Sequence, residues 1–124
     1  MKIYYGKRLG PRELSSDVKV IVSEQHDDGV ECLIRPLKHY IRHSPTGFEW
    51  GYAGSGPADL ALSILWNFLG KEPSRILYMD FKNQFVARWK DKWEITGQQI
   101  KDWIIKSYGE EHFLYLMGIS DPRD

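Results

Sequence analysis

The segment from residue 57 to residue 69 limits the folds open to this chain, because a helix made from it is apolar over most of its circumference. After the first residue its polar positions are Asp59, Ser63 and Asn67, which are spaced by four and so form one narrow stripe. A helix of this kind must be buried on most sides. Gly70 is well placed to end it. We therefore predict a central helix at about 57–69, packed against a sheet and covered by other segments.

The residues before this helix alternate between apolar and polar positions, which is the pattern of half-buried strands. The alternation predicts strands over 17–23 and 30–35, with a shorter one at 3–5. The Asp28-Gly29 pair favours a hairpin between the two longer strands. Aromatic residues at every second position from 48 to 52 predict a further strand with one aromatic face.

The second half of the chain has weaker signals and one strong one. Residues 85–89 and 93–95 are predicted as strands, and a short helix is predicted around residues 76–78. Thr96 and Gln99 have the spacing of a capping box, which predicts the start of an amphipathic helix at about 97–108. The apolar face of that helix is Ile100, Trp103 and Ile104, and Gly109 ends it.

Length and composition favour a single domain. The chain has 124 residues, 42% of them hydrophobic, which suffices for one core and not for two. Several strands and two good helices without regular β-α-β alternation indicate an α+β fold. We therefore expect one compact domain over 1–124, mainly an antiparallel sheet packed around the buried helix. Residues 110–124 form an acidic C-terminal segment whose tip we expect to be frayed.

Charge and cysteine content exclude several classes of protein. The 17 basic and 17 acidic residues cancel, which argues against a uniformly basic nucleic-acid coat and an acidic disordered chain. Cys32 is the only cysteine, so no intramolecular disulfide can form and a reducing setting is favoured. No apolar run approaches the roughly 20 residues of a membrane helix, and the N-terminus has no secretory pattern. We expect a cytoplasmic protein with no membrane partner.

The central block of the sequence resembles a small uncharacterised domain family of bacteria and their phages. The resemblance is carried by residues 47–65, Gly-Phe-Glu-Trp-Gly-Tyr-Ala-Gly-Ser-Gly-Pro-Ala-Asp-Leu-Ala-Leu-Ser-Ile-Leu. It continues through Phe81-Lys82, Val86-Ala87, Trp93, Thr96 and Trp103, so that residues 47–105 match well and the first 46 only loosely. The family has no assigned reaction, so the resemblance implies no catalytic residues.

The glycine-rich turn before the central helix is the first candidate site. Such a turn can aim backbone N–H groups at an anion. Pro57, which lacks an N–H, and Asp59, at the positive end of the helix dipole, oppose this interpretation. The structural alternative is that the glycines provide unusual backbone angles and close packing. The candidate ligand-binding residues are Glu49, Trp50, Tyr52, Gly54, Ser55, Gly56, Arg42 and His43.

Glu49 has a functional and a structural interpretation. Its carboxylate lies between Phe48 and Trp50, and a buried carboxylate there is salt-bridged, accepts backbone N–H bonds or faces a pocket. Buried charges are paired more often than catalytic, yet a buried acid is also a functional candidate. One hypothesis is therefore a hydrolase with Glu49 as the base and His43 as its partner.

Metal and cofactor chemistry have little support. His39 and His43 are four residues apart, but Ser44-Pro45-Thr46-Gly47 argues for a loop, and the remaining His and Cys residues have no complementary spacing. No nucleophile-elbow spacing supports a Ser-His or Cys-His site. We expect no metal, no cofactor and no catalytic residues.

Two functions follow from these patterns. The first is a non-enzymatic binding module, of phage or mobile-element origin, that binds a protein or a small anionic ligand at the Glu49–Gly56 strand and turn, flanked by the loop 35–46. The second is nucleic-acid binding through two basic segments, 35–43 and 82–92, next to Trp89 and Trp93. The candidate residues for nucleic acid are Arg35, Lys38, Lys82, Arg88, Lys90 and Lys92.

Overall fold

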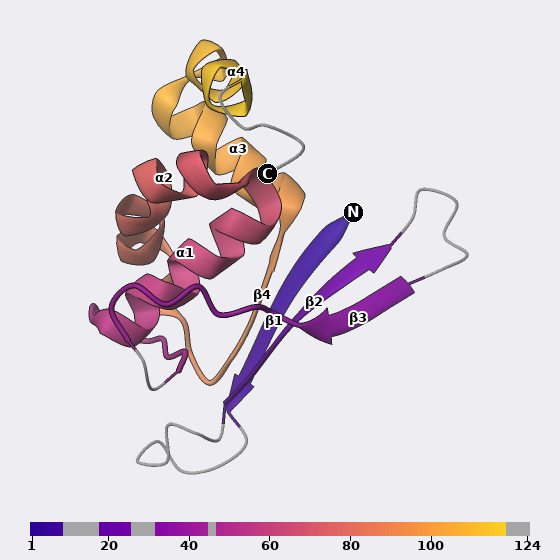
Figure 1. Cartoon of the computed structure of the whole chain (residues 1–124), viewed down its shortest axis with the longest axis vertical. Helices are drawn as coiled ribbons and strands as arrows, with labels where there is room; N and C mark the ends of the chain where they lie inside the picture. Colours follow the sequence, from indigo (N-terminus) through magenta and orange to yellow (C-terminus); the bar gives the residue numbers. More distant parts are fainter. Residues whose placement is uncertain (9–17, 26–31, 45–46, 119–124) are drawn as a thin grey trace.

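A computed structural model of the chain describes residues 1–8, 18–25, 32–44 and 47–118, and a four-stranded sheet with helices on one side makes up its fold (Figure 1). The elements follow in the order β1 (Lys2–Arg8), β2 (Val18–Gln25), β3 (Cys32–Pro36), α1 (Ser55–Leu69), α2 (Lys71–Gln84), the 3-10 helix η1 (Val86–Arg88), β4 (Lys92–Thr96), α3 (Gly97–Tyr108) and α4 (Glu110–Gly118). The prediction of an α+β fold is confirmed. The predicted hairpin turn and the tip of the C-terminal segment lie outside the described residues.

The sheet has the strand order β3-β2-β1-β4, and every neighbouring pair is antiparallel. β1 is central because it pairs with β2 on one side and with β4 on the other. Tyr4 lies opposite Val22 and Ile95, and all three are buried against the helices. The strands predicted at 3–5 and 93–95 are therefore confirmed, and the strand predicted at 17–23 is confirmed from residue 18 onwards. Residues 32–35 of the strand predicted at 30–35 belong to the edge strand β3. Residues 17, 30 and 31 lie outside the described residues.

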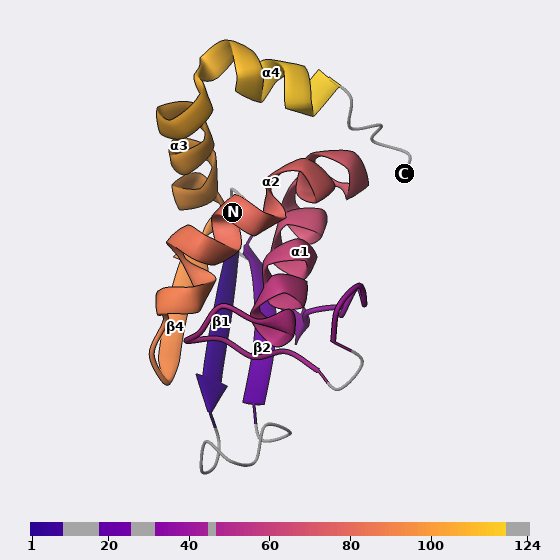
Figure 2. The same cartoon turned by 90° about the vertical axis from the view of Figure 1, so that its left-hand side faces the viewer.

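The predicted central helix is confirmed as α1. Every residue from Gly56 to Leu65 is buried, and α1 lies between the sheet and α2 (Figure 2). α1 begins at Ser55, two residues earlier than predicted, so Asp59 lies beyond its first turn and does not stabilise the positive end of the helix dipole as expected. Gly70 follows the helix with φ 97°, a backbone conformation that favours glycine.

Two of the predicted strands are wrong. Residues 47–54, which include the predicted strand at 48–52, form an irregular loop whose Glu49 and Trp50 are buried. Residues 85–89, predicted as a strand, contain η1 instead, and Gly51 N–H donates to the carbonyl of Val86 at 3.0 Å. Trp50 is fully buried, and Phe48, Phe85 and Trp89 are partly buried against the core from a non-strand backbone, whereas Tyr52 is exposed. Packing here overrides the period-2 pattern.

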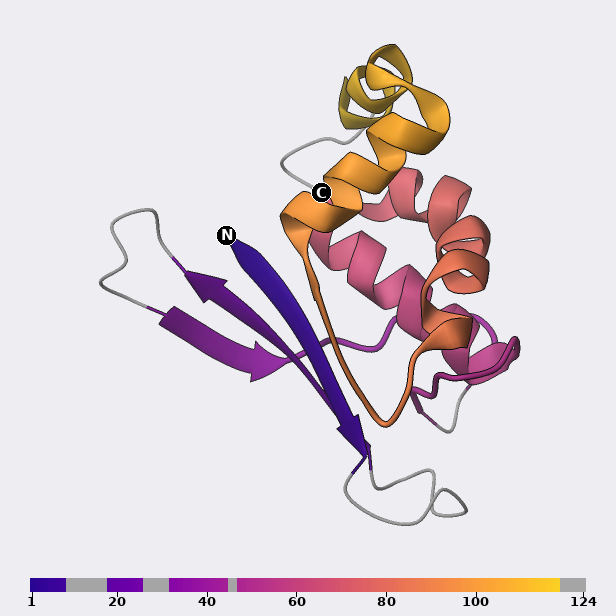
Figure 3. The same ribbon diagram turned by 180° about the vertical axis from the view of Figure 1, so that it is seen from behind.

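The C-terminal half is more helical than predicted. The short helix expected around 76–78 is the 14-residue helix α2. The capping box of α3 is confirmed: Gln99 N–H donates to Thr96 Oγ1 at 3.1 Å, and Thr96 N–H donates to Gln99 Oε1 at 2.9 Å. The acidic segment after Gly109 begins with a further helix, α4, at the end of the molecule away from β3 (Figures 1 and 3). Across the described ranges, no helix is both long and apolar enough to cross a membrane.

Candidate functional site

The chain between β3 and α1 is attached to α1 by a buried carboxylate. Asp59 is fully buried and accepts hydrogen bonds from His39 Nε2 at 2.9 Å, from His43 N–H at 2.9 Å and from Ser44 N–H at 2.9 Å. The N–H of Arg42 lies 3.2 Å from both carboxylate oxygens. Residues 39–44 have no regular secondary structure of their own, so the hydrogen bonds to Asp59 fix the course of this segment.

These hydrogen bonds change the acidity of Asp59. Burial by itself would raise its pKa, because it disfavours the charged form. The hydrogen bond from His39 and the backbone N–H groups of Ser44, His43 and Arg42 act in the other direction and leave the pKa below its ordinary value. The folded protein thus holds this carboxylate in its charged form.

The other two polar residues of the α1 stripe also hold chain segments. Ser63 Oγ accepts a hydrogen bond from Tyr40 N–H at 2.9 Å. Asn67 Oδ1 accepts from Tyr4 OH at 2.8 Å and from Lys2 Nζ at 3.3 Å, which connects α1 to β1. The polar stripe predicted from the sequence is therefore the side of α1 that forms hydrogen bonds to the neighbouring chain segments.

A groove opens where residues 40–42 lie against α1 and α2, and its volume is about 310 Å³. We call it the basic groove. Its lining residues are Tyr40, Ile41, Arg42, Leu62, Trp66, Lys71 and Arg75. Among these described lining residues three are cationic and none is acidic. Arg75 also forms an exposed ion pair with Glu72 at 3.8 Å, and such pairs contribute little to stability, so Arg75 can turn to a ligand at small cost.

One wall of the basic groove is aromatic. The rings of Tyr40 and Trp66 are stacked, with centroids 3.9 Å apart and an angle of 5° between their planes. Lys38 Nζ lies 5.0 Å from the centroid of the Tyr40 ring. The wall therefore combines a stacked aromatic pair with a fourth cation that lies over the Tyr40 ring.

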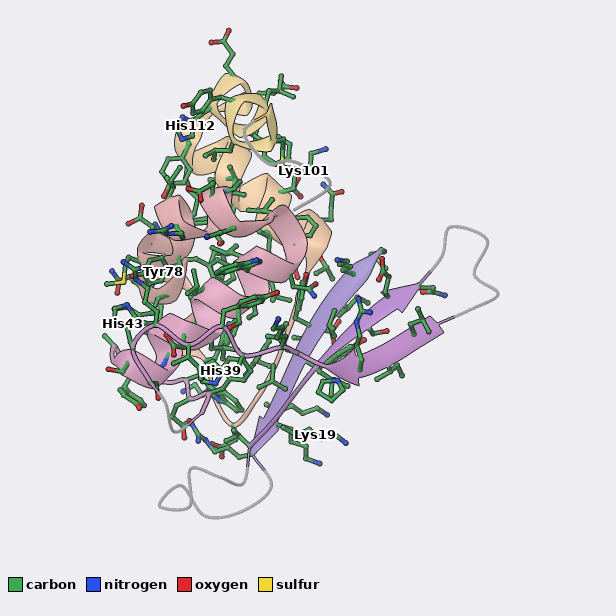
Figure 4. All side chains as sticks on the ribbon, viewed as in Figure 1. Lys19, His39, His43, Tyr78, Lys101 and His112 are labelled. Carbon is green, nitrogen blue, oxygen red and sulfur yellow. The ribbon has the colours of Figure 1, made fainter. Side chains whose placement is uncertain are left out.

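Of the predicted ligand-binding residues, Arg42 lines this groove and His43 lies beside it. His43 Nε2 is 2.9 Å from Tyr78 OH, and the two side chains lie together in Figure 4. The guanidinium carbon of Arg42 is 6.0 Å from the centroid of the Tyr78 ring. Tyr78 thus connects the loop to α2.

Glu49 occupies a different part of the molecule, at the end of β1. Its carboxylate forms an ion pair with Arg8 Nη1 at 2.5 Å and accepts Trp50 N–H at 3.0 Å. Arg8 also donates to the carbonyl of Trp50 at 3.1 Å and pairs with Asp91 at 3.2 Å. This geometry matches the structural interpretation of Glu49, in which an arginine and a backbone N–H hold a buried carboxylate.

The glycine-rich turn packs closely on that ion pair. A Cβ on Gly56 would come within 2.6 Å of Glu49 Cβ, and one on Gly54 would come within 2.5 Å of the Tyr52 ring. Ser55 and Tyr52 are exposed. Trp50 is fully buried, and its Nε1 donates to the carbonyl of Lys90 at 2.6 Å. The glycines here serve close packing.

A second cavity, of about 270 Å³, lies next to Arg8 and touches the turn at Gly51. Its other lining residues are Arg88, Trp89, Lys90 and Asp91. The ring of Trp89 stacks on that of Trp93 with centroids 3.9 Å apart. Asp91 lines this cavity and pairs with Arg8, whereas no acidic residue is among the described residues that line the basic groove.

The six candidate residues for nucleic acid do not form one surface. Arg35 lies on the edge strand, where it pairs with Glu24 at 3.5 Å, and Lys38 lies at the basic groove. Arg88 and Lys90 line the second cavity, and Lys92 lies on the sheet. Lys82 is 8% exposed, so it is not available to a phosphate.

The residues that the structure describes assemble neither a metal site nor the hydrolase pair. Within the described ranges, no group of three His, Cys, Asp or Glu residues could hold a metal ion. The carboxylate of Glu49 is bonded to Arg8 and to the N–H of Trp50, whereas His43 is bonded to Tyr78 and His39 to Asp59. A base and its partner would need to share a hydrogen bond.

Lys71, Arg75 and Trp66 line the basic groove but were not among the predicted site residues. Lys71 and Arg75 are four residues apart and so share one face of α2, a signal that could have been found had the helix been extended back to Gly70. The sequence pattern places Trp66 only on the apolar surface of the predicted central helix. Its pairing with Tyr40 depends on the path of the loop, which the sequence does not reveal.

Comparison with known proteins gives a family and no activity. Neither the curated proteins nor the solved structures include a match to this chain. Residues 4–106 match a family of unknown function, DUF6166, and this stretch includes most of β1, the basic groove, the Arg8–Glu49 ion pair and most of α3. The chain therefore belongs to the DUF6166 family.

Proposed function

We propose that this protein is a small non-enzymatic binding module that takes a phosphate-bearing ligand in the basic groove. The observation that carries the proposal is that Arg42, Lys71 and Arg75 line one groove without an acidic lining residue among those described. Cations held near one another repel, and an anion of matching size relieves that repulsion. Glu72 pairs with Arg75 at 3.8 Å, but this pair is exposed and balances the charge only weakly. Guanidinium groups also bind phosphate oxygens in pairs.

The aromatic wall narrows the class of ligand. Tyr40 and Trp66 form a stacked aromatic pair next to the cations, and Leu62 lies at the same groove. A ligand with a planar group beside its phosphate, such as a mononucleotide, satisfies both features, because stacking and charge then act together. Inorganic phosphate would use the cations alone.

The Glu49–Gly56 segment does not line the basic groove, but it helps to position the groove through α1. The close contact between Gly56 and Glu49 sets the start of α1, and α1 then holds the groove loop through Asp59 and Ser63. In this proposal the glycine-rich turn is a scaffold for the ligand site. An origin in phages or mobile elements, as the sequence resemblance implies, is part of the same proposal.

The test is a titration of the protein with adenosine monophosphate and with inorganic phosphate, followed by amide NMR. We expect shifts at residues 40–42 and at Lys71 and Arg75, and a weaker interaction when salt is raised, because screening acts on exposed charges. The double variant Lys71→Ala/Arg75→Ala should bind at least about tenfold more weakly, since each charged hydrogen bond is worth about 1.5–3 kcal/mol.

The matched control is Lys101→Ala, which removes a cation that lies 5.5 Å from the Phe113 ring on the α3–α4 side of the molecule. It should leave binding unchanged. If millimolar nucleotide and phosphate leave the groove residues unshifted, or if the control weakens binding as much as the double variant, the proposal is wrong.

Single-stranded nucleic acid is the second candidate, and the position of Lys38 favours it. Lys38 extends the basic groove along the path by which the chain leaves β3, where Arg35 lies. Stacking aromatic rings with flanking cations are the features that single strands require. An oligothymidylate that binds more tightly than the mononucleotide, and that loses affinity on Lys38→Ala as well as Lys71→Ala, would favour this candidate.

A further inference from the structure

The face of the sheet that points away from the helices carries its own pattern, independent of the basic groove. The register places Tyr5 opposite Ile21, and Ile34 opposite Ser23, on this face. It also places Lys7 directly opposite Lys19 on one side and Lys92 on the other. Lys19 projects from the sheet on the side away from the helices (Figure 4). We call these residues the outer sheet face.

The lysine row is unfavourable by itself. Like charges directly opposite one another on neighbouring strands destabilise a sheet, and here three lysines stand side by side across β2, β1 and β4. They border a hollow of about 480 Å³ that also includes Tyr5, Ile21 and Ile34. No acidic residue lines this hollow among those described, although Glu94 lies opposite Tyr5 on β4. The outer sheet face is therefore complementary to a surface with acidic residues followed by apolar ones.

Helix α4 presents such a surface. Glu110 and Glu111 occupy its first turn, and both are exposed. Leu114 and Tyr115 follow one turn later, are 61% and 62% exposed and lie next to each other in the chain, so they form a small exposed apolar patch. The order along the helix, acidic and then apolar, matches the order along β1, from Lys7 to Tyr5.

We propose that a second copy of this chain occupies the outer sheet face, with α4 of one protomer packed on the sheet of the other. Glu110 and Glu111 then lie at the lysine row, and Leu114 and Tyr115 lie over Tyr5, Ile21 and Ile34. Reciprocal exchange of the two surfaces closes the pair with two-fold symmetry, which is the commonest form of a homo-oligomer. The dimer does not use the basic groove, so this inference stands without the proposed function.

The experiment measures the mass of the protein by sedimentation equilibrium from about 10 μM to about 1 mM, the range in which a small interface associates. We expect the mass to rise from that of a monomer towards twice that value. The variant Lys7→Glu/Lys19→Glu/Lys92→Glu should remain monomeric, and so should Glu110→Lys/Glu111→Lys. An equimolar mixture of the two variants should dimerise, because both contacts between them pair opposite charges.

Further variants separate this result from misfolding or general charge effects. Lys38→Glu, a charge reversal at the basic groove, should dimerise as the native chain does. Ile34→Ser and Leu114→Ser change one exposed apolar residue on each surface and should each weaken dimerisation at least about tenfold. Circular dichroism of each variant checks that it is folded.

Three results would overturn the proposal. The first is a monomer at every concentration, and the second is a dimer that both sets of charge reversals leave intact. The third is a failure of the mixed variants to associate while each is folded. If the native chain stays monomeric and the lysine variant instead loses binding to an oligothymidylate, the outer sheet face belongs to nucleic acid and the dimer is wrong.

Discussion

The carboxylate of Asp59 and the imidazole of His39 share a hydrogen bond of 2.9 Å, and with it a buried helix holds a loop that has no regular structure of its own. The same carboxylate accepts the backbone N–H groups of Arg42, His43 and Ser44. Because Arg42 and Tyr40 belong to the basic groove, the geometry of the groove depends on Asp59, which itself faces no ligand.

Replacing Asp59 with asparagine should destabilise the protein strongly. The change, Asp59→Asn, removes the charge that four donors share and leaves buried N–H groups with a weaker or missing acceptor, at a cost of about 3 kcal/mol. Urea denaturation followed by circular dichroism measures the change in the free energy of unfolding.

The matched control is Asp102→Asn on the exposed face of α3. Asp102 accepts one hydrogen bond, from Gln98 Nε2 at 2.8 Å, so its replacement should change the free energy of unfolding by less than about 0.5 kcal/mol. Equal effects of the two variants would contradict the role assigned to Asp59.

The contribution of Asp59 should also depend on pH. Its pKa is lower in the folded protein than in the unfolded chain, where it is about 3.9, so the unfolded chain takes up the proton first as the pH falls. The stabilisation is complete above about pH 5 and is lost as the pH falls through the folded-state pKa. The stability difference between the native chain and Asp59→Asn should shrink between about pH 5 and pH 3. A difference that stays constant or grows over this range would refute the assignment.

Whether replacing Gly56 with alanine stabilises or destabilises the protein tests whether the glycine-rich turn serves close packing. Gly56 lies in the first turn of α1, where alanine has the better helix propensity and would be expected to stabilise by up to about 1 kcal/mol. A Cβ there would instead meet Glu49 Cβ at 2.6 Å and its backbone nitrogen at 3.2 Å, so we expect Gly56→Ala to destabilise by about 1–3 kcal/mol.

Gly118→Ala is the control for this change. Gly118 has no neighbour within 4 Å of an added Cβ and no positive φ, so alanine there should be neutral or slightly stabilising. Thermal unfolding of both variants gives the comparison. If Gly56→Ala raises the midpoint of unfolding, the close packing of Gly56 on Glu49 does not constrain the turn.

Local sequence patterns correctly predicted those elements whose own periodicity or capping residues match the environment that they have in the fold. Helix α1 is apolar nearly all round, and it is buried as that pattern requires. The capping box at Thr96 formed because both of its partners are three residues apart, so no distant contact was needed. The strands around Tyr4 and Val22 alternate because one face of the sheet packs on the helices.

Tertiary contacts decided the structure of those segments in which the local sequence pattern does not match the folded environment. The alternating aromatic residues at 48–52 have the pattern of a strand, but Glu49 is drawn to Arg8, 41 positions away in the sequence, and Trp50 to the carbonyl of Lys90. These contacts outweigh the local preference, because a buried charge must be paired.

The sequence by itself therefore determined which segment is buried, which segments alternate and where the helix at residue 97 begins, since these follow from side-chain periodicity and local capping. The basic groove and the outer sheet face were decided only by the tertiary structure. The groove joins residues 40–42 to Trp66, Lys71 and Arg75, and the lysine row joins three strands that are separate in the chain. Periodicity carries no information about which distant residues meet, because that depends on how the buried surfaces pack together.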